Sequence, residues 1–267
     1  MVRVDADSAQ TGESHPTVGS LVVTLRTSPH ASCAIVCFPW AGAGVAAFFP
    51  WLKLVPDSLD ISVVRLPGRE SRIAEAPFRS LTEAAKAIAQ ALAPTLLKRT
   101  VFFGHSLGAL LAFETAQELE GQQRSILDAL VVSGANDPSA PHGGHLHQLE
   151  DDHLRKAVAR MSGDAETGQL SPSIQPMILR PLRADCEMAE TYVSRRRPPL
   201  STPILAYLGN ADSSIDATTI WRWGLCSRAG AQVRWFDGGH FFLRDHPAPV
   251  VEQLVADVRT QQQQRSR

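Results

Sequence analysis

A Gly-x-Ser-x-Gly motif at residues 104–108 constrains this chain more than any other feature of its sequence. An apolar run that predicts a short buried strand precedes the motif, and a helical pattern over residues 109–119 follows it. A strand, a tight turn and a helix are the context that a nucleophile elbow requires, with Ser106 at the turn. Such a turn strains the serine backbone, so glycines are needed where neighbouring chain passes closely. The helix that begins behind Ser106 favours negative charge at its hydroxyl.

The composition is that of a globular protein with one large domain. The chain has 267 residues, of which 44% are hydrophobic and 20% charged. Its net charge of −1 gives no reason to expect a nucleic-acid partner. No apolar run approaches the ~20 residues of a membrane span, and residues 1–17 lack the apolar core of a signal peptide. Cys33 and Cys37 fall in a buried-strand pattern, so we expect reduced core thiols and a cytoplasmic protein.

Strand-like runs alternate with helical patterns along most of the chain. The expected strands are 21–26, 33–38, 61–66, the run before Ser106, 129–133, 203–208 and 232–236; the expected helices are 46–54, 81–97, 109–119, 217–226 and 248–258. This alternation predicts an α/β fold, with a mainly parallel central sheet flanked by helices on both faces. We expect a single domain at residues 20–260, a flexible N-terminal segment at 1–19 and a frayed tail at 261–267.

The alternation stops between residues 136 and 197, where no strand is predicted. Helical patterns occur instead at 153–161, 173–179 and 183–195. A helical insertion in the middle of an α/β domain is typical of a lid over a site. The insertion also follows a strand whose carboxyl end would face the elbow, which favours a lid over a second helical layer with no gating role.

Polar residues after two late strands complete a catalytic arrangement with Ser106. A serine hydroxyl needs a base within hydrogen-bond reach, and the base needs an anionic group that holds its tautomer. In α/β-hydrolases the order along the chain is serine, acid, histidine. Asp212 and His240 stand in that order, each just after a predicted strand, where open α/β sheets place their sites.

Each of these assignments has a neighbouring alternative. Asp216 and Asp237 could supply the acid, but the acid chosen above lies in the first turn after an apolar strand, from which a carboxylate can reach inward. His246 could supply the base, but the glycines before the chosen base allow a tight turn that projects its ring. His105 lies beside the nucleophile, and we expect it to point away and to be structural.

Two backbone N–H groups should form the oxyanion hole. One is expected from Leu107, the residue after the nucleophile. The other is expected from the loop after an early strand, residues 39–44, with Ala41 as the predicted donor and Trp40 as the alternative.

Two further clusters carry less weight. His142, His145 and His147 resemble a metal-binding tract, but glycines lie between them and no cysteine or carboxylate pattern accompanies them, so no metal site is expected. The three arginines at 195–197 are either a solvated turn or a contact for an acidic partner.

With these residues assembled, the chain resembles the type II thioesterases of polyketide and nonribosomal peptide assembly lines. The resemblance covers the chain from Cys33 to the final helix and rests on residues 38–44, 66–72, 104–108, 182–185, 209–212 and 238–242. Within these motifs, the Pro-Gly-Arg-Glu and Leu-Arg-Ala-Asp stretches are more specific to the family than the serine motif. Reasoning from the residues explains neither stretch.

The resemblance implies an α/β-hydrolase fold and a stand-alone serine thioesterase. Such an enzyme hydrolyses acyl groups from the phosphopantetheine arm of acyl or peptidyl carrier proteins, and so clears stalled or wrongly primed units. The family's triad maps onto Ser106, Asp212 and His240, in agreement with the assignment from the residues, and its lid maps onto 136–197. The resemblance also implies a monomer without a cofactor of its own, because phosphopantetheine belongs to the substrate.

The sequence departs from the family pattern at three places. Trp40 stands where histidine or phenylalanine is common, which makes it a candidate for reshaping the acyl pocket. Leu107 stands where methionine is common, but its expected role uses only the backbone N–H. Asn210 and Ala211 replace the more frequent second glycine before the acid.

The same residues would serve three other functions. An acyltransferase would pass the acyl group to an alcohol or amine in place of water, and a carboxylesterase would act on free esters. A hydrolase-like binding module would have lost turnover, against which the intact serine, aspartate and histidine argue.

Overall fold

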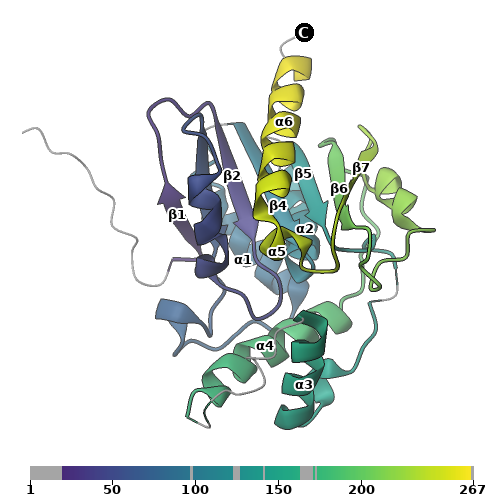
Figure 1. The fold of residues 1–267 in the computed structure, drawn as a ribbon. Coiled ribbons are helices and arrows are strands. Elements are labelled where there is room, and N and C mark those ends of the chain that lie inside the picture. Colours follow the sequence, from purple (N-terminus) through teal and green to yellow (C-terminus); the bar gives the residue numbers. More distant parts are fainter. Residues whose placement is uncertain are drawn as a thin grey trace, which may run out of the picture.

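A mainly parallel sheet forms the centre of the computed structural model, which describes residues 20–96, 99–122, 127–140, 142–162, 171 and 173–265. Its strands are β1 (Val22–Arg26), β2 (Cys33–Phe38), β3 (Leu59–Val64), β4 (Arg99–His105), β5 (Leu127–Ser133), β6 (Ile204–Gly209) and β7 (Ala231–Phe236). In the described part of the chain they form one seven-stranded sheet in the order β1-β3-β2-β4-β5-β6-β7 (Figure 1). β1 pairs antiparallel with β3, and the other neighbours are parallel. The predicted α/β fold is confirmed.

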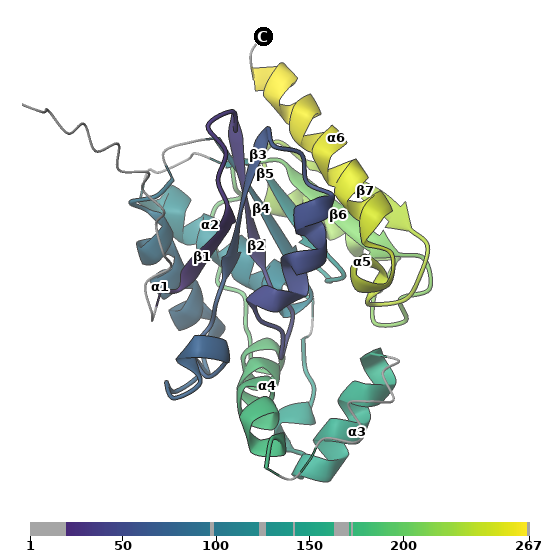
Figure 2. The same ribbon diagram turned by 60° about the vertical axis from the view of Figure 1, so that its left-hand side comes forward.

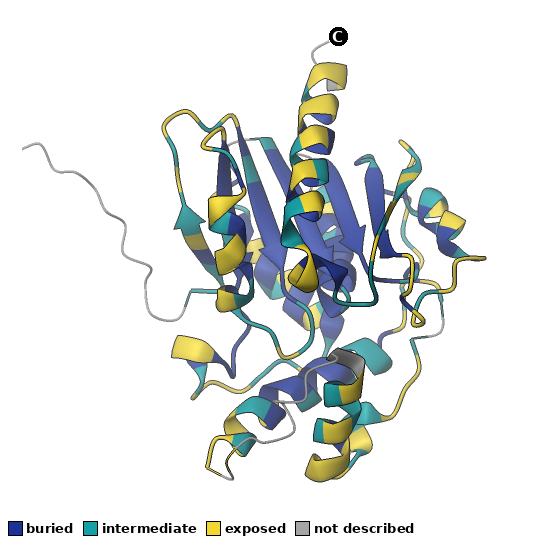
Figure 3. Cartoon of the chain, viewed as in Figure 1, coloured by how far each residue is buried: buried dark blue, intermediate teal, exposed yellow. Residues whose placement is uncertain are grey.

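Helices cover both faces of the sheet, so its inner strands are buried on both sides (Figure 3). On one face lie α1 (Leu81–Leu92) and α2 (Leu107–Gly121); on the other lie the 3-10 helix η1 (Val45–Lys53) and α6 (Pro247–Arg265) (Figure 2). Successive side chains of β4 pack into the cores on opposite faces of the sheet. Phe102 packs in the core with α1 and α2, and Phe103 packs in the core with η1 and α6; both are fully buried.

Three expected helices differ in type or end. α1 ends at Leu92 and not at 97, because Pro94 cannot donate a backbone hydrogen bond and restricts the residue before it. The helices expected at 46–54 and 217–226 are 3-10 helices, η1 and η5 (Ile220–Cys226). Pro50 lies inside η1 and limits regular α-helical bonding there.

The C-terminal helix is longer than the sequence predicts. α6 continues to Arg265, so residues 261–265 of the expected tail are helical. Gln261 is only 7% exposed, so the helix packs against the domain as far as this residue, whereas residues 263 and 264 are exposed. Residues 266–267 and the expected flexible segment 1–19 lie outside the described residues.

The insertion contains the short η3 (Leu146–Gln148) and two helices, α3 (Asp151–Ser162) and α4 (Gln175–Glu190). No described residue between 136 and 197 forms a strand, as expected. The two helices expected at 173–179 and 183–195 are one helix, because α4 runs through Pro181. A proline removes one helical hydrogen bond, and the buried side chains of Leu179 and Leu182 offset that loss.

The insertion lies at one end of the sheet. α3 and α4 lie beyond the carboxyl ends of the parallel strands, where the segments after β4, β6 and β7 also emerge (Figures 1 and 2). A four-residue helix after β7, α5 (Phe242–Asp245), was not predicted. Among the described residues, no helix combines the length and the apolar character that crossing a membrane requires.

Candidate active site

Ser106 occupies a strained turn between β4 and α2. Its φ of 56° and ψ of −120° fall in a region that non-glycine residues rarely adopt. The turn is held from both sides, because Ser106 N–H donates to the Ser133 carbonyl at 2.8 Å and Ala109 N–H donates to the Ser106 carbonyl at 2.9 Å. The predicted strand, strained turn and helix are therefore all present.

The two glycines of the motif permit close backbone contacts. A Cβ atom at Gly104 would lie 2.1 Å from the carbonyl oxygen of Gly108. A Cβ atom at Gly108 would lie 2.0 Å from the carbonyl oxygen of Phe38, at the end of β2. The first glycine lets the helix start directly over its strand, and the second lets the β2 strand end approach the helix. The steric reason expected from the sequence is confirmed at both positions.

The segments after β6 and β7 bring Asp212 and His240 together. Asp212 Oδ2 lies 2.7 Å from His240 Nδ1. The two segments are also joined through their backbones, because Ala211 N–H donates to the Gly238 carbonyl at 2.9 Å. Gly238 has a φ of 123°, which agrees with the tight turn expected before the histidine.

Asp212 is buried and fully hydrogen-bonded. Its side chain is 1% exposed, and its second oxygen, Oδ1, accepts from the Ser214 hydroxyl at 2.6 Å and from Ser214 N–H at 3.0 Å. Burial raises the pKa of Asp212, but the hydrogen bonds from His240 and Ser214 outweigh it and hold that pKa below its usual value. The carboxylate is therefore charged at neutral pH. The Ser214 hydroxyl also lies 3.2 Å from His240 Nδ1, and sequence reasoning assigned this residue no role.

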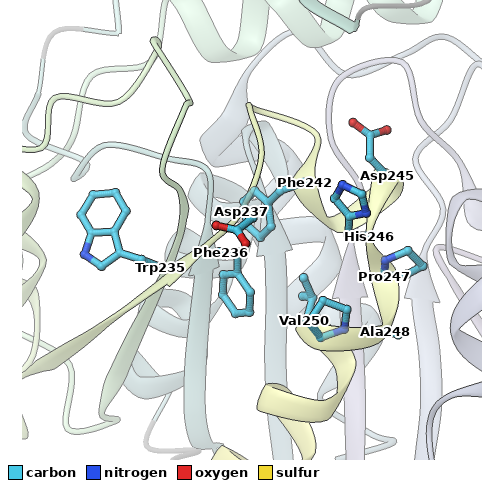
Figure 4. A pocket seen from close by; sticks show the side chains of 10 residues that line it. Trp235, Phe236, Asp237, Phe242, Asp245, His246, Pro247, Ala248 and Val250 are labelled. Atoms are coloured by element: carbon cyan, nitrogen blue, oxygen red, sulfur yellow. The ribbon is translucent and has the colours of Figure 1, made fainter.

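The alternative residues have other partners. Asp216 accepts from the Thr218 hydroxyl at 2.5 Å, and Asp237 accepts from the Asn210 amide at 2.9 Å. His246 lines a cavity of about 650 Å³ between the end of β7 and the start of α6 (Figure 4). None of Ser106, Asp212 and His240 lines that cavity.

His105 packs inside the fold, which agrees with the structural role expected from its sequence position. It is fully buried, and its Nδ1 lies 2.9 Å from the Ser133 hydroxyl. Burial, with His240 nearby, lowers its pKa well below the ordinary value, so the ring stays neutral. Its ring centroid lies 5.0 Å from that of His240, which brings the base next to the elbow.

Within the described residues no hydrogen bond joins Ser106 Oγ to His240. Hydrogen bonds between a nucleophile and its base often tighten only when substrate is bound.

The loop after β2 forms a type II turn beside the elbow. Ala43 N–H donates to the Trp40 carbonyl at 3.0 Å, and Gly42 has the φ of 77° that the third residue of such a turn requires. Gly42 N–H is already engaged by Asp185 Oδ2 at 2.8 Å. In the described structure the N–H groups of Ala41 and Leu107 have no acceptor within the protein, so both remain available to a ligand.

Trp40 belongs to an aromatic cluster around the base. Its ring centroid lies 5.7 Å from His105, 5.8 Å from Phe241 and 6.1 Å from Phe48. Phe241 in turn lies 5.0 Å from His240, edge to face. The sequence motif included Phe241, but no role followed from its pattern.

A cavity of about 530 Å³ separates the insertion from the acid and base. Ala157 and Arg160 of α3 line one side, and Asp212, Ser214 and His240 line the other. The insertion therefore faces the predicted acid and base.

The histidines at 142, 145 and 147 and the arginines at 195–197 do not gather into a common site. His147 Nδ1 contacts Glu190 at 2.5 Å, while the His142 ring lies 5.5 Å from that of Tyr192. Among the described residues, no three His, Cys, Asp or Glu side chains are grouped as a metal would need. Arg197 pairs with Glu118 at 2.6 Å, whereas the other two arginines of that run are exposed. The thiols expected in the core are buried and free, and burial raises the pKa of Cys33 to about 12.

Comparison with known proteins gives one consistent result. The thioesterase domain model matches residues 34–259. Thioesterase PikA5 of Streptomyces venezuelae is 33% identical over 228 residues, which cover 85% of this chain and 81% of PikA5. The Gramicidin S biosynthesis protein GrsT of Aneurinibacillus migulanus is 27% identical over 91% of this chain and 95% of its own. The structure of BorB, a type II thioesterase from the borrelidin biosynthetic cluster, superposes with a TM-score of 0.82 at 30% identity, covering 89% of this chain and 97% of BorB.

Proposed function

The chain belongs to the thioesterase family and is a thioester hydrolase, and from this premise we propose that it removes acyl groups from the phosphopantetheine arm of carrier proteins. The polyketide and nonribosomal peptide relatives support a type II, stand-alone enzyme that edits stalled or wrongly primed acyl units. Its partners are then acyl or peptidyl carrier domains. We further propose that it works as a cytoplasmic monomer and needs no cofactor, because the pantetheine arm arrives with the substrate.

Ser106 is the proposed nucleophile and His240 its base. Because Asp212 Oδ2 accepts from His240 Nδ1 at 2.7 Å, the proton of the neutral ring lies on Nδ1 and Nε2 keeps its lone pair. Nε2 takes the Ser106 proton as the hydroxyl attacks the thioester carbonyl, and Asp212 stabilises the imidazolium that forms. The pantetheine thiol then leaves with a proton from His240. In the second half, His240 activates a water that hydrolyses the acyl-serine ester.

The oxyanion of each tetrahedral intermediate would be bound by Leu107 N–H and Ala41 N–H. Leu107 is the first residue of α2, so the positive end of the helix adds to the field at that point. Both donors are fixed before substrate arrives, so little reorganisation opposes the reaction. Each such donor contributes roughly 3 kcal/mol to stabilising the transition state.

Trp40 and the insertion would shape access to the site. The Trp40 ring lies against His105 and Phe241 and forms an apolar wall where the acyl chain can pack. The cavity between α3 and His240 would admit the pantetheine arm to the side of the site where the acid and base lie. We propose that α3 and α4 act as a lid that excludes water once the acyl chain is bound.

One observation carries this proposal: a hydrogen-bonded Asp212–His240 pair lies against His105, whose neighbour in the chain is a serine with the strained backbone that an elbow requires. The test loads a carrier protein with a short acyl-phosphopantetheine thioester and follows release by intact-protein mass spectrometry. Wild type should release the acyl group, and Ser106→Ala should be slower by about 10³-fold or more.

Each other function predicts a different result in the same experiment. A carboxylesterase would leave the carrier loaded but cleave small free esters. An acyltransferase would accumulate an acyl-enzyme that persists in water until an alcohol or amine is added. A binding module would neither release the acyl group nor label at Ser106 with a fluorophosphonate.

A further inference from the structure

The two sequence stretches that had no explanation meet in space as a buried ion pair. Arg69 follows β3, and Asp185 lies in α4, 116 residues later. Arg69 Nη1 and Nη2 donate to the two oxygens of Asp185 at 2.8 Å and 2.7 Å. The side chains are 7% and 0% exposed. This bidentate geometry is specific to a guanidinium and a carboxylate, and a lysine side chain cannot reproduce it.

The remaining hydrogen bonds of the pair go to the loop at residues 39–44. Asp185 Oδ2 accepts from Gly42 N–H at 2.8 Å, and Arg69 Nη1 donates to the Ala43 carbonyl at 2.7 Å. The first bond holds the central peptide of the type II turn, between Ala41 and Gly42, and the second holds the peptide that follows Ala43. The pair therefore fixes which way the turn faces, since the central peptide of a turn can otherwise flip between type I and type II.

Neighbours of the pair close around the same loop. Glu70 Oε1 accepts from Ala46 N–H at 3.2 Å, just after the loop. Glu70 itself has a φ of 49°, so the backbone beside Arg69 is strained. A Cβ atom at Gly42 would lie 3.0 Å from Leu182 Cδ1 of α4. The loop is thus packed between the β3–α1 connection and a helix of the insertion.

We propose that Arg69 and Asp185 are positioning residues that hold Ala41 N–H at the oxyanion site and tie that site to α4. This inference rests on the proposed function, in which Ala41 N–H stabilises the transition state. Neither side chain touches the substrate. A shift of α4 moves Asp185, and through Gly42 it moves the oxyanion donor, so the position of the insertion and the rate of the chemical step are linked.

Asp185→Asn and Arg69→Lys test the pair with little change of shape. Asparagine keeps one oxygen, but its amide N–H₂ then faces a donor of either Arg69 or Gly42. Lysine keeps the positive charge, so the buried carboxylate stays paired and a folded protein is expected even if Asp185→Asn is unstable. Arg72→Gln is the matched control, because Arg72 is an equally buried arginine of the same segment that binds Glu75 at 2.8 Å and does not contact the loop.

We expect both test variants to lower kcat, normalised to fluorophosphonate-titrated sites, by 10- to 100-fold, which is about 1.4 to 2.7 kcal/mol of transition-state stabilisation. KM should change by less than about threefold. Affinity for an alkyl boronic acid, which mimics the tetrahedral intermediate, should fall by the same factor as kcat/KM. Arg72→Gln should lower Tm but leave kcat and boronic acid affinity unchanged.

The pair is merely structural, and the inference is overturned, if both test variants keep kcat and boronic acid affinity within twofold of wild type while Tm falls as in the control. A rise in KM at constant kcat would overturn it too, because it would place the pair in substrate binding. The proposed function fails separately: wild type would then not release acyl groups from carriers. Boronic acid affinity and turnover of an acyl N-acetylcysteamine thioester would still report on the pair in that case.

Discussion

Replacing Gly108 by alanine should damage catalysis much more than stability. A Cβ atom at this position would lie 2.0 Å from the Phe38 carbonyl oxygen and 2.7 Å from the Pro39 carbonyl oxygen. Both are backbone atoms at the start of the loop that carries Ala41, so no side-chain rotation relieves the clash. Real Cβ contacts essentially never fall below 3.0 Å, so the loop and the start of α2 must separate by about 1.0 Å (3.0 − 2.0).

That separation acts directly on the proposed oxyanion hole. Leu107 N–H moves with α2 and Ala41 N–H moves with the loop, so one of the two bonds to the oxyanion lengthens from about 2.9 Å to nearly 4 Å and is lost. Loss of one donor costs roughly 10²–10³ in kcat. Overpacking of this kind destabilises a protein by about 1–3 kcal/mol, which lowers Tm by about 2–4 °C for each kcal/mol in a domain of this size.

The assay compares kcat per titrated active site and Tm for wild type, Gly108→Ala and Gly121→Ala. Gly121 lies near the end of the same helix, and an added Cβ would meet nothing within 4 Å. The control should therefore keep its activity, and Tm should rise slightly because alanine is the better helix former by about 0.5–1 kcal/mol. If Gly108→Ala folds and retains kcat within threefold of wild type, the close approach of helix and loop is not what assembles the site.

Three further outcomes are expected. Asp212→Asn should lower kcat by roughly 10³–10⁴-fold, because an amide donor favours the wrong tautomer of His240; Asp216→Asn should have wild-type kinetics, and equal losses in the two variants would reject the assignment of the acid. Ser214→Ala removes the 2.6 Å bond to Asp212 and should lower kcat about 3- to 30-fold at nearly constant KM; an unchanged kcat in steady-state assays would show that this bond does not position the carboxylate. His105 should make the protein sensitive to acid, because its pKa in the folded state lies well below its unfolded value near 6.5. Below pH 6.5 the unfolded state therefore binds one more proton than the folded state. The free energy of unfolding should then fall by about 1.4 kcal/mol for each unit that the pH drops. Urea titrations at pH 7, 6 and 5 should show this slope in wild type and its loss in His105→Asn, and equal slopes would mean that another group carries the effect.

Much of the sheet could be predicted from the sequence because its signals are local. Continuous apolar runs such as β2 and β5 occur where a strand is covered on both faces, and their ends match the prediction within about two residues. The types and ends of the helices were predicted less accurately than the strands. Apolar periodicity does not distinguish a 3-10 helix from an α-helix over one or two turns, and it does not show when tertiary packing outweighs a proline, as in α4 around Pro181.

The residues of the candidate site also fall into those that the sequence predicts and those that only the structure shows. Ser106, Asp212 and His240 could be named because glycine patterns and strand ends mark them locally, and the contact between the last two has the geometry that this assignment needs. Their catalytic roles stay predictions until the variants above are assayed. No role for Ser214 or Phe241 followed from the sequence, and only the folded chain shows that they touch the acid and the base.

The sequence by itself determined the α/β fold and the order of serine, acid and histidine, because burial periodicity and steric demands at glycines are properties of a few consecutive residues. The tertiary structure alone decided that Ser214 contacts the acid and what holds the loop beside the elbow. Arg69 and Asp185 stand 116 residues apart, and neither stretch carries a local sign of its partner. A contact of that kind arises only when the sheet and the insertion have packed, since its energy comes from desolvated charges brought into a fixed geometry.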